Sequence, residues 1–397
     1  AAAAGAEDAP VVKLLQSVFE DAVQANASDV HIEPQERNVR IRFRIDGVLQ
    51  VQTEVDTRIG PALVLRLKLM GGLDISEKRR PQDGRFNVLV REQQVDVRLS
   101  TMPVQHGESV VMRLLTRKSG LLSLDHLGMP PDMLARYRQI IQRTNGMILV
   151  TGQTGSGKTT TLYATLAEVN STEKKIITVE DPVEYRLPGV NQVQVNEKIE
   201  LSFSTVLRST LRQDPDVILI GEMRDQETAQ IGLRAALTGH LVLSTLHTKD
   251  AATTPIRLID MGAPYYMVGT SIHAVLAQRL VRLNCESCVR PRPLDAGEQA
   301  WIQREYAVEV DPARFKRGHG CSHCNGTGLS GRTGIYEMLE VSPEMASALN
   351  QNHNEDFVRL ADTALKGRSL KHQALELALA GRSPVGEIVR VASELGD

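Results

Sequence analysis

Hydrophobic residues in the first part of the chain switch between helical and strand spacing. Within residues 10–27 they recur every three or four positions, which predicts an amphipathic helix. A second helical stretch covers 59–70, and short runs with strand character cover residues 30–32, 39–45, 48–51, 86–90, 95–99 and 109–115. This mixture predicts an α+β domain over residues 10–115. The chain begins Ala-Ala-Ala-Ala-Gly rather than with Met, so we expect residues 1–9 to be a disordered leader of a trimmed chain.

The pattern changes after a predicted linker, residues 116–131, which ends in Pro-Pro. Helical stretches then alternate with uniformly apolar runs at residues 147–150, 176–179, 217–220 and 241–244. Strands without alternation are typical of a parallel sheet buried on both faces. We therefore expect an α/β fold, with a RecA-like P-loop core over 132–284. A cysteine-containing module, 285–340, and a helical region, 341–397, complete the predicted organisation.

Residues 152–159 read Gly-Gln-Thr-Gly-Ser-Gly-Lys-Thr, a complete P-loop between a predicted strand and a predicted helix. A glycine-rich turn that contains a lysine by coincidence would not need those flanking elements. Backbone N–H groups of such a loop, together with the helix N-terminus, bind phosphate. Lys158 is expected to reach the β- and γ-phosphates of ATP, and the Thr159 hydroxyl to bind Mg²⁺. The predicted nucleotide contacts of the loop are Gly152, Thr154, Gly155, Ser156, Gly157, Lys158, Thr159 and Thr160.

Carboxylates follow two of the predicted strands. Glu180 and Glu184 come after the run at 176–179, at the sheet edge where α/β proteins bind ligands. They are expected to position the attacking water or contact the Mg²⁺ shell, although an acidic loop in water is the alternative. Glu222 follows the run at 217–220, after Gly221 in the place where a Walker B strand usually carries an Asp. We expect Glu222 to orient water.

Histidines and arginines supply further candidates. His240 and His247 stand at either end of the apolar run at 241–244, and one or both could sense the γ-phosphate. The alternative for each is a structural histidine. The arginine candidates lie in the core and in strands of the first domain, where solvated faces are the alternative to phosphate contacts. They are Arg208 and Arg212, which share a helical face, Arg224, Arg98 and Arg113.

The four cysteines of the chain form two Cys-x-x-Cys pairs, Cys285 with Cys288 and Cys321 with Cys324. Each pair lies in a turn-rich stretch, and the long interval between them predicts an intervening helix. Two such pairs can supply four thiolates to one structural Zn²⁺. Two disulfides or four free thiols are the alternatives, and disulfides fit poorly with a cytosolic nucleotide-binding protein. His319 and His323 flank the second pair and are expected to be bystanders.

Composition disfavours some classes of function. The net charge of −2 and the 4% aromatic residues do not favour a nucleic-acid binder. No uncharged apolar stretch reaches the length of a membrane span. A nucleic-acid translocase built on the same core remains the alternative class, and a nucleotide-binding scaffold without turnover is a third.

Together these motifs resemble the GspE/PilB-type secretion ATPase superfamily of type II secretion and type IV or MSHA-type pilus assembly. The likeness covers about residues 10–345. The residues that carry it are the P-loop, the acidic stretch 177–185, the Walker B region 211–225 and the histidine stretch 238–250. The first domain adds Ser-Asp-Val-His-Ile-Glu-Pro at 28–34, Arg-Phe-Arg-Ile-Asp-Gly at 42–47 and Pro-Gln-Asp-Gly-Arg at 81–85. Gly at position 221 is usual in that family.

The resemblance implies a cytoplasmic homo-hexameric motor, peripheral to the inner membrane, that works with platform and docking proteins of a secretion or pilus machine. It implies ATP between a PAS-like first domain and the core, with Glu222 as the catalytic glutamate and no nucleic acid. Arg98 and Arg113 match arginines that the first domain sends toward the phosphates. The cysteine quartet points to an assembly motor rather than a retraction motor. The resemblance also implies a preceding N-terminal region that docks on a membrane partner or binds a cyclic dinucleotide.

Overall fold

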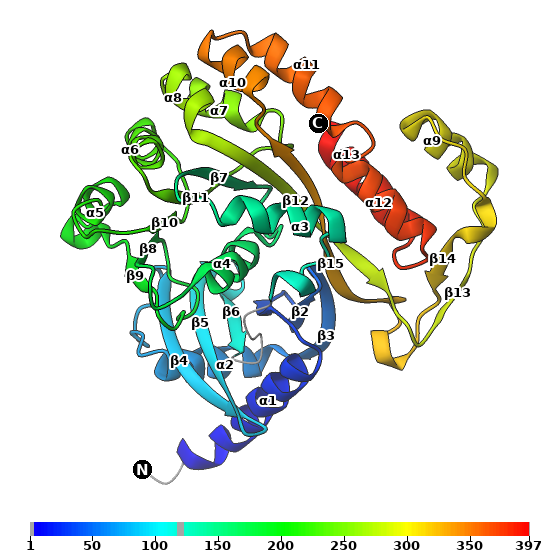
Figure 1. Cartoon of the computed structure of the whole chain (residues 1–397). Coiled ribbons are helices and arrows are strands. Elements are labelled where there is room, and N and C mark those ends of the chain that lie inside the picture. Colours follow the sequence, from blue (N-terminus) through cyan, green and yellow to red (C-terminus); the bar gives the residue numbers. More distant parts are fainter. Residues whose placement is uncertain (1–3, 117–122, 397) are drawn as a thin grey trace. The chain divides into compact units, whose positions relative to one another are not determined.

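The computed structural model describes residues 4–116 and 123–396, which divide into two compact units, Ala1–Gly120 and Leu121–Asp397 (Figure 1). Residues 1–3 of the expected leader and 117–122 of the expected linker lie outside the described residues. Helix α1 begins at Ala4, so the prediction of a disordered leader is wrong for residues 4–9.

The first unit is a six-stranded antiparallel sheet in the order β3-β2-β1-β6-β5-β4, with two helices packed on it. Alternate strand residues such as Val39, Ile41 and Phe43 are buried against the helices, as the strand periodicity predicts. The helices are α1 (Ala4–Gln24) and α2 (Gly60–Met70). The strands are β1 (Asp29–Pro34), β2 (Asn38–Ile45), β3 (Val48–Asp56), β4 (Gln82–Val90), β5 (Gln93–Val104) and β6 (Gly107–Thr116).

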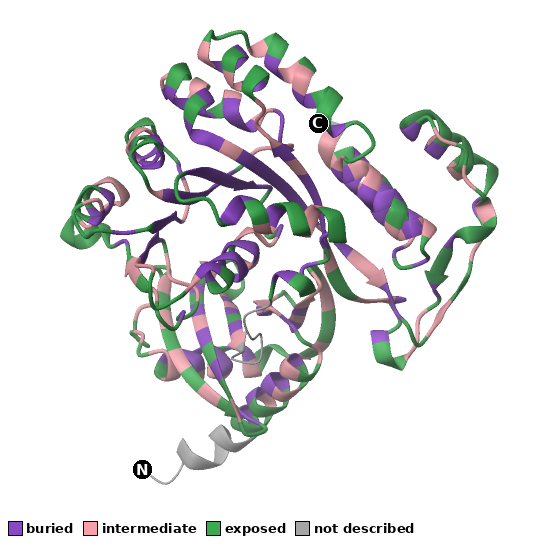
Figure 2. Ribbon diagram, in the orientation of Figure 1, coloured by how far each residue is buried: buried purple, intermediate pink, exposed green. Residues whose placement is uncertain are grey.

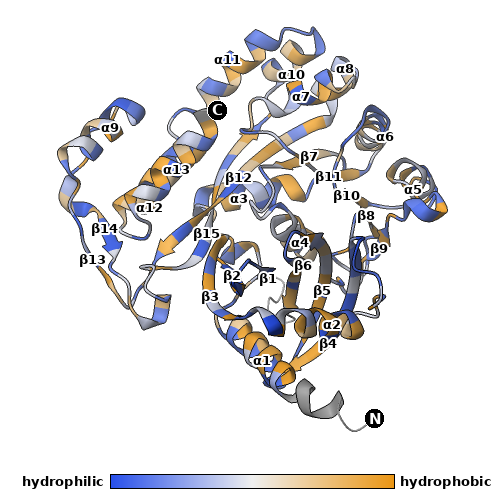
Figure 3. Cartoon of the chain, turned by 180° about the vertical axis from the view of Figure 1, so that it is seen from behind, coloured by the Kyte–Doolittle hydropathy of each residue, from blue (hydrophilic) through white to orange (hydrophobic). Residues whose placement is uncertain are grey.

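The second unit is built on a seven-stranded sheet in the order β15-β12-β7-β11-β10-β8-β9. Its central strands are buried along their whole length, and the buried and hydrophobic colours follow them (Figures 2 and 3). The strands are β7 (Gly146–Thr151), β8 (Ile176–Glu180), β9 (Asn191–Gln194), β10 (Val217–Ile220), β11 (Leu241–Leu246), β12 (Ile272–Asn284) and β15 (Leu329–Glu340). The parallel α/β core predicted from the apolar runs is confirmed.

Helices cover both faces of this sheet. On one face α3 (Pro131–Ile141) and α4 (Lys158–Val169) enclose one hydrophobic cluster. The helices of the other face enclose a second, larger cluster. They are α5 (Phe203–Thr210), α6 (Gln226–Leu237), α7 (Thr254–Asp260), α8 (Tyr265–Ser271), α10 (Pro343–Asn350), α11 (Asn354–Leu365), α12 (Leu370–Leu379) and α13 (Val385–Gly396). Helix α9 (Ala296–Tyr306) adds Ile302 and Tyr306 to this cluster from beside α12.

The sheet extends beyond the predicted end of the core at residue 284. Strand β15, which the sequence analysis assigned to the cysteine module, pairs antiparallel with β12 from Ala274–Glu340 to Asn284–Leu329. What remains outside the sheet is a loop that holds the cysteines, the small β13 (Val289–Pro291) and β14 (Lys316–Gly318) ribbon, and α9. The helix expected between the two cysteine pairs is confirmed as α9. The core and the module therefore share one sheet. The sequence did not predict this, because pairing between distant segments leaves no local pattern.

Candidate functional site

The P-loop connects β7 to α4 at the carboxyl edge of the sheet. Gly152 has a φ of +150°, which a side chain would adopt only with strain. A Cβ atom at Gly152 would lie 2.5 Å from the Gln278 carbonyl oxygen and 2.5 Å from Ser156 Oγ, so only glycine fits. Helix α4 begins at Lys158, as predicted, and its exposed N-terminal end carries Thr159. The loop thus has the strand, turn and helix that a phosphate site requires.

Lys158 folds back over the loop. Its Nζ donates to the carbonyl oxygens of Gly152 at 2.8 Å and Gln153 at 3.0 Å. Burial, and then the charge of Arg279, lowers the pKa of Lys158 to about 8, while Glu222 acts in the opposite direction. The pKa of the Lys158 amine is therefore close to neutral pH, so that its protonation can change near the P-loop.

This lowered pKa predicts that nucleotide affinity falls with rising pH. The protonated Lys158 attracts phosphate, and bound phosphate in turn raises the pKa of the amine. Above the free-state value of about 8, binding must therefore take up a proton. We expect the Kd for ATP to rise by up to about tenfold per pH unit between about pH 8 and about pH 9.5. Titration with a fluorescent nucleotide measures this, and Lys158→Met should bind weakly without the slope. A flat wild-type profile would contradict the assignment.

Glu222 and His247 meet beside the P-loop. Parallel strands bring them there, because Leu246 pairs with Thr151 and Ile220 pairs with Ser244. Glu222 Oε2 lies 3.8 Å from His247 Nε2, and the carboxylate is only 18% exposed. Burial, followed by the positive charge of Lys158, lowers the pKa of His247, which favours the neutral ring. The carboxylate and the neutral ring thus place hydrogen-bond acceptors beside the P-loop.

The structure also accounts for Gly221 in place of the usual Walker B aspartate. A Cβ at Gly221 would lie 3.2 Å from the Val179 carbonyl oxygen and 3.3 Å from Glu180 Cα. Contacts this short leave little room for a side chain between β10 and β8. The carboxylate of this strand end therefore comes from Glu222, one residue later.

Glu180 lies at the end of β8, but its carboxylate is engaged in a buried network. It is 4% exposed and accepts hydrogen bonds from Tyr163 Oη, from Thr178 Oγ1 at 2.6 Å and from Gln192 Nε2 at 3.2 Å. The Glu184 N–H donates to Tyr163 Oη at 3.3 Å. The acidic stretch is thus connected through Tyr163 to the P-loop helix. This geometry favours a positioning role for Glu180 over direct activation of water.

The structure separates the two histidines. His240 precedes β11 and its Nδ1 lies 3.0 Å from the Ala235 carbonyl oxygen, at the amino edge of the sheet. The six residues of β11 place it about 20 Å from the P-loop edge. The prediction that His240 contacts the nucleotide is therefore wrong within one chain, because the parallel strand carries its two ends to opposite edges. Of the two histidines, His247 is the one that lies beside the P-loop.

The core arginines also divide. Arg224 forms an ion pair with Glu222. Arg208 pairs with Glu227 on α6, and Arg212 Nη1 donates to the Arg208 carbonyl oxygen at 2.9 Å. Arg224 is thus joined to the P-loop cluster, whereas Arg208 and Arg212 have contacts on the exposed side of α5.

In the first unit, arginines form a row across the sheet. Arg98 lies directly opposite Arg113, and Arg85 and Asp29 continue the row on the neighbouring strands. The residues on either side of Arg98 are buried in the core, so the row lies on the face away from the helices. Arg113 is 58% exposed and its Nε lies 3.2 Å from Asp29 Oδ1. The unit thus presents a concentration of positive charge suited to an anion.

The four cysteine sulfur atoms converge within 4.8 Å of one another. Cys285 Sγ lies 3.8 Å from Cys321 Sγ, and Cys288 Sγ lies 3.8 Å from Cys324 Sγ. Four thiolates around one ion with metal–sulfur bonds of about 2.3 Å would be about 3.8 Å apart. The cysteines are free rather than disulfide-bonded. The arrangement fits a tetrahedral metal ion.

Backbone N–H groups donate to two of the sulfur atoms, those of Cys324 and Cys288, although burial raises the pKa of Cys288 to about 11. Burial opposes ionisation of Cys324, but hydrogen bonds from the N–H groups of Cys321 and Gly328 lower its pKa to about 6. Gly320 N–H donates to Cys288 Sγ at 3.3 Å. Neither His319 nor His323 belongs to the group of converging ligand atoms found among the described residues. The sulfurs therefore have both the spacing and the surrounding donors of a metal site.

Comparison with known proteins identifies the family of the chain. The sequence matches the family described as Type II/IV secretion system protein over residues 4–390. The chain belongs to this family. It is 44% identical over 389 residues to type II secretion system protein E of Pseudomonas aeruginosa, which covers 98% of this chain and 76% of the relative. It is also 44% identical over 388 residues to the type II secretion system ATPase E of Vibrio cholerae, with 98% and 76% covered.

Solved structures agree with the family membership. The crystal structure of the pilus retraction motor PilT with bound ADP matches with a TM-score of 0.63 at 25% identity, covering 95% of this chain and 96% of PilT. The ATPase DotB of Legionella pneumophila matches with a TM-score of 0.69 at 20% identity, covering 96% and 95%. The DotB likeness shows the fold alone.

Several residues of this family member escaped the sequence analysis because their partners are distant in the chain. Gln278 of β12 is fully buried, and its side chain contacts the P-loop and α4. Arg279 is 2% exposed and donates to the Gln278 and Lys249 carbonyl oxygens at 2.9 and 2.8 Å. Tyr163 holds Glu180. The sequence did offer a signal for Gln278 and Arg279, because they interrupt an otherwise apolar stretch and buried polar groups require partners.

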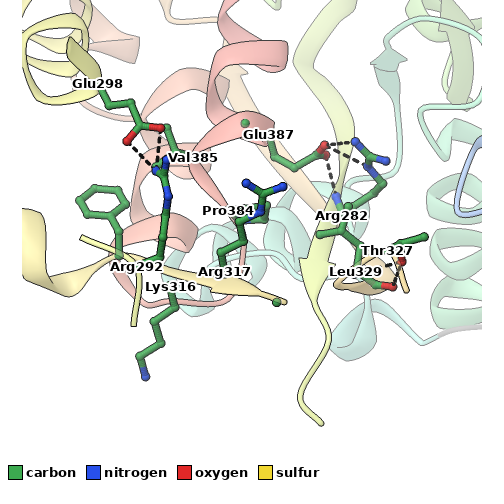
Figure 4. Close-up of a pocket in the computed structure, with 13 residues that line it drawn as sticks. Arg282, Arg292, Glu298, Lys316, Arg317, Thr327, Leu329, Pro384, Val385 and Glu387 are labelled. Carbon is green, nitrogen blue, oxygen red and sulfur yellow. Dashed lines mark hydrogen bonds and ion pairs between the residues drawn. The ribbon is translucent and has the colours of Figure 1, made fainter. Parts of the chain in front are cut away.

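A pocket of about 290 Å³ lies between the cysteine module and the start of α13 (Figure 4). Glu387, which is 2% exposed, accepts from Arg282 Nε at 2.9 Å and Nη2 at 2.7 Å. On the other side Arg292 Nη1 donates to Glu298 at 2.5 and 2.7 Å. Figure 4 shows both ion pairs, with Lys316 pointing away from them. The first pair joins β12 to α13, whereas the second lies within the cysteine module.

Among the residues that the structure describes, no helix combines the length and the apolar character needed to cross a lipid bilayer.

Proposed function

We propose that this member of the secretion family hydrolyses ATP and uses the resulting conformational change to drive protein secretion. The observation that carries the proposal is the convergence of Lys158, Glu222 and His247 at one sheet edge, next to a P-loop with the required strand and helix. The relative from Vibrio cholerae is named an ATPase, and PilT was solved with ADP. A binding scaffold without turnover would not need Glu222.

In the proposed reaction the P-loop amides and Lys158 bind the phosphates of ATP. Glu222 orients the attacking water toward the γ-phosphate, and Arg224 together with His247 holds the Glu222 carboxylate in place. Mg²⁺, held by Thr159, would neutralise charge on the phosphates. Glu180 acts indirectly, since the hydrogen bond from Tyr163 ties the end of β8 to α4.

Arg98 and Arg113 of the first unit are proposed to complete the site. Their row on the sheet supplies guanidinium groups in a rigid array, which suits the charge that develops on a transferring phosphoryl group. Closure of the first unit on the core would bring these arginines to the phosphates and exclude water. Reopening after phosphate release would provide the mechanical step.

This role predicts a specific kinetic signature for Arg113→Ala. Because the guanidinium contributes most when charge develops, kcat should fall about a thousandfold or more, while the Kd for ATP changes by less than about threefold. Arg58→Ala is the matched control, since Arg58 lies in the same unit and pairs with the exposed Asp56. Phosphate release and nucleotide titration measure the two quantities. Equal losses in kcat and affinity would contradict the role.

We propose further that six copies form a ring at the cytoplasmic face of the inner membrane, bound there through platform and docking proteins. The support is the family membership and the relatives named as type II secretion proteins at 44% identity over nearly the whole chain. The same relatives favour type II secretion over pilus assembly. Neither the net charge nor the family favours a nucleic-acid translocase.

Zinc is the proposed occupant of the cysteine site. Four thiolates in a tetrahedral arrangement without an open position are typical of structural zinc. Cys285, Cys288, Cys321 and Cys324 would hold the ion, which would stabilise the loop outside the sheet. The site lies outside the P-loop cluster, so we assign it no part in hydrolysis.

A further inference from the structure

Gln278 links two parts of the phosphate site from the neighbouring strand. Strand β12 runs parallel to β7, and Ala277 pairs with Thr151, the last residue before the P-loop. Gln278 therefore lies beside the point where β7 ends and the P-loop begins. Its side chain is fully buried.

The nitrogen and the oxygen of the Gln278 side-chain amide each form a hydrogen bond. Nε2 donates to the Ser156 carbonyl oxygen at 2.6 Å, and Oε1 accepts from Thr161 Oγ1 at 2.7 Å. Ser156 belongs to the P-loop, whereas Thr161 lies in the first turn and a half of α4. One side chain thus fixes the loop relative to the helix that follows it. A carboxylate could accept from Thr161 but could not donate to Ser156.

The contact has a direct consequence for phosphate binding. A P-loop binds anions through N–H groups that point inward, so its carbonyl oxygens must point elsewhere. The Ser156 carbonyl is held on the outer side by Gln278 Nε2. The backbone of Gln278 is itself fixed, because Arg279 Nη1 donates to its carbonyl oxygen at 2.9 Å. The donor therefore comes from a rigid strand rather than from the loop.

We propose that Gln278 is a positioning residue of the nucleotide site, which sets the orientation of the P-loop through Ser156 and of α4 through Thr161. The proposal rests on the ATP binding proposed above. It predicts an effect mainly on affinity, since the loop holds the phosphates equally in the ground state and the transition state.

Two variants of nearly the same size test this. Gln278→Met removes both hydrogen bonds, and Gln278→Glu loses the donor while its carboxyl is ionised. In each case a buried carbonyl or hydroxyl is left without its partner, which corresponds to about a tenfold rise in the Kd for ATP at about pH 8. We expect kcat at saturating ATP to change less than about threefold.

The pH dependence separates positioning from simple packing. Once it is protonated, the carboxyl group introduced by Gln278→Glu can again donate to Ser156 and accept from Thr161. The affinity of this variant should therefore recover toward that of the wild-type protein as the pH falls to about 5.5, whereas Gln278→Met should show no recovery. The titratable and charged groups that face this position are Lys158 of the loop, Arg279 of the same strand and Tyr336 of β15. They are present in all three proteins, and the introduced carboxylate of Gln278→Glu is the one charge that differs.

The experiment is titration of the 397-residue chain and of each variant with a fluorescent ATP analogue at about pH 8 and about pH 5.5, together with kcat at the higher pH. Recovery in Gln278→Glu alone supports the proposal, and this comparison within one variant stands even if Gln278→Met fails to fold. Wild-type affinity in both variants, or equal losses at both pH values, would overturn it. A wild-type chain that binds no nucleotide would instead refute the proposed function.

Discussion

Glu222→Gln should lower the kcat for ATP hydrolysis about a hundredfold to ten-thousandfold while the Kd for ATP changes less than about threefold. The amide has the shape of the carboxylate but cannot accept the proton of the attacking water. Binding is expected to persist because Lys158 and the loop amides, not Glu222, hold the phosphates. Phosphate release under saturating ATP and nucleotide titration measure the two effects separately.

Glu173→Gln is the matched control for this prediction. Glu173 is an exposed residue of the same unit, so its loss should leave both quantities unchanged. Turnover in Glu222→Gln at the wild-type rate would remove Glu222 from the reaction. A matched loss of affinity would mean that the variant disturbs the loop rather than the chemistry.

Cys321→Ser should remove the metal from the cysteine site and destabilise the loop around it. A serine hydroxyl is a poor ligand for zinc, and an ion held by three thiolates loses much of the roughly 10–16 kcal/mol with which structural sites bind it. We expect the metal content to fall from about one ion per chain to well below half, with a lower temperature of unfolding. Elemental analysis and thermal unfolding measure these changes.

His323→Ser is the control for the cysteine site. His323 lies between two of the ligands in sequence but outside the group of converging atoms. It should keep its metal and its stability. Full metal content in Cys321→Ser would contradict the four-thiolate site, and loss of metal in His323→Ser would add a ligand that the structure does not include.

Features with a local sequence signature were predictable. The apolar runs at 147–150, 176–179, 217–220 and 241–244 became the parallel strands β7, β8, β10 and β11, since burial on both faces leaves an uninterrupted run. The P-loop and the cysteine pairs depend on spacing between nearby residues. Such patterns are visible without the fold, which is why they lie where expected.

Features that depend on distant partners were not predictable in the same way. The pairing of β15 with β12 joins segments on either side of the cysteine module. Gln278 has a function only beside Ser156, and Glu180 becomes a buried acceptor only beside Tyr163 and Gln192. His240 was misassigned because sequence proximity to His247 hides the length of the strand between them.

The most direct test of the central claim is phosphate release by the chain over a wide range of protein concentrations, with Glu222→Gln measured alongside. An ATPase that becomes active on assembling into the proposed ring predicts a specific activity that rises with concentration and is lost in Glu222→Gln. Activity that is independent of concentration and equal in the two proteins would contradict the catalytic assignment.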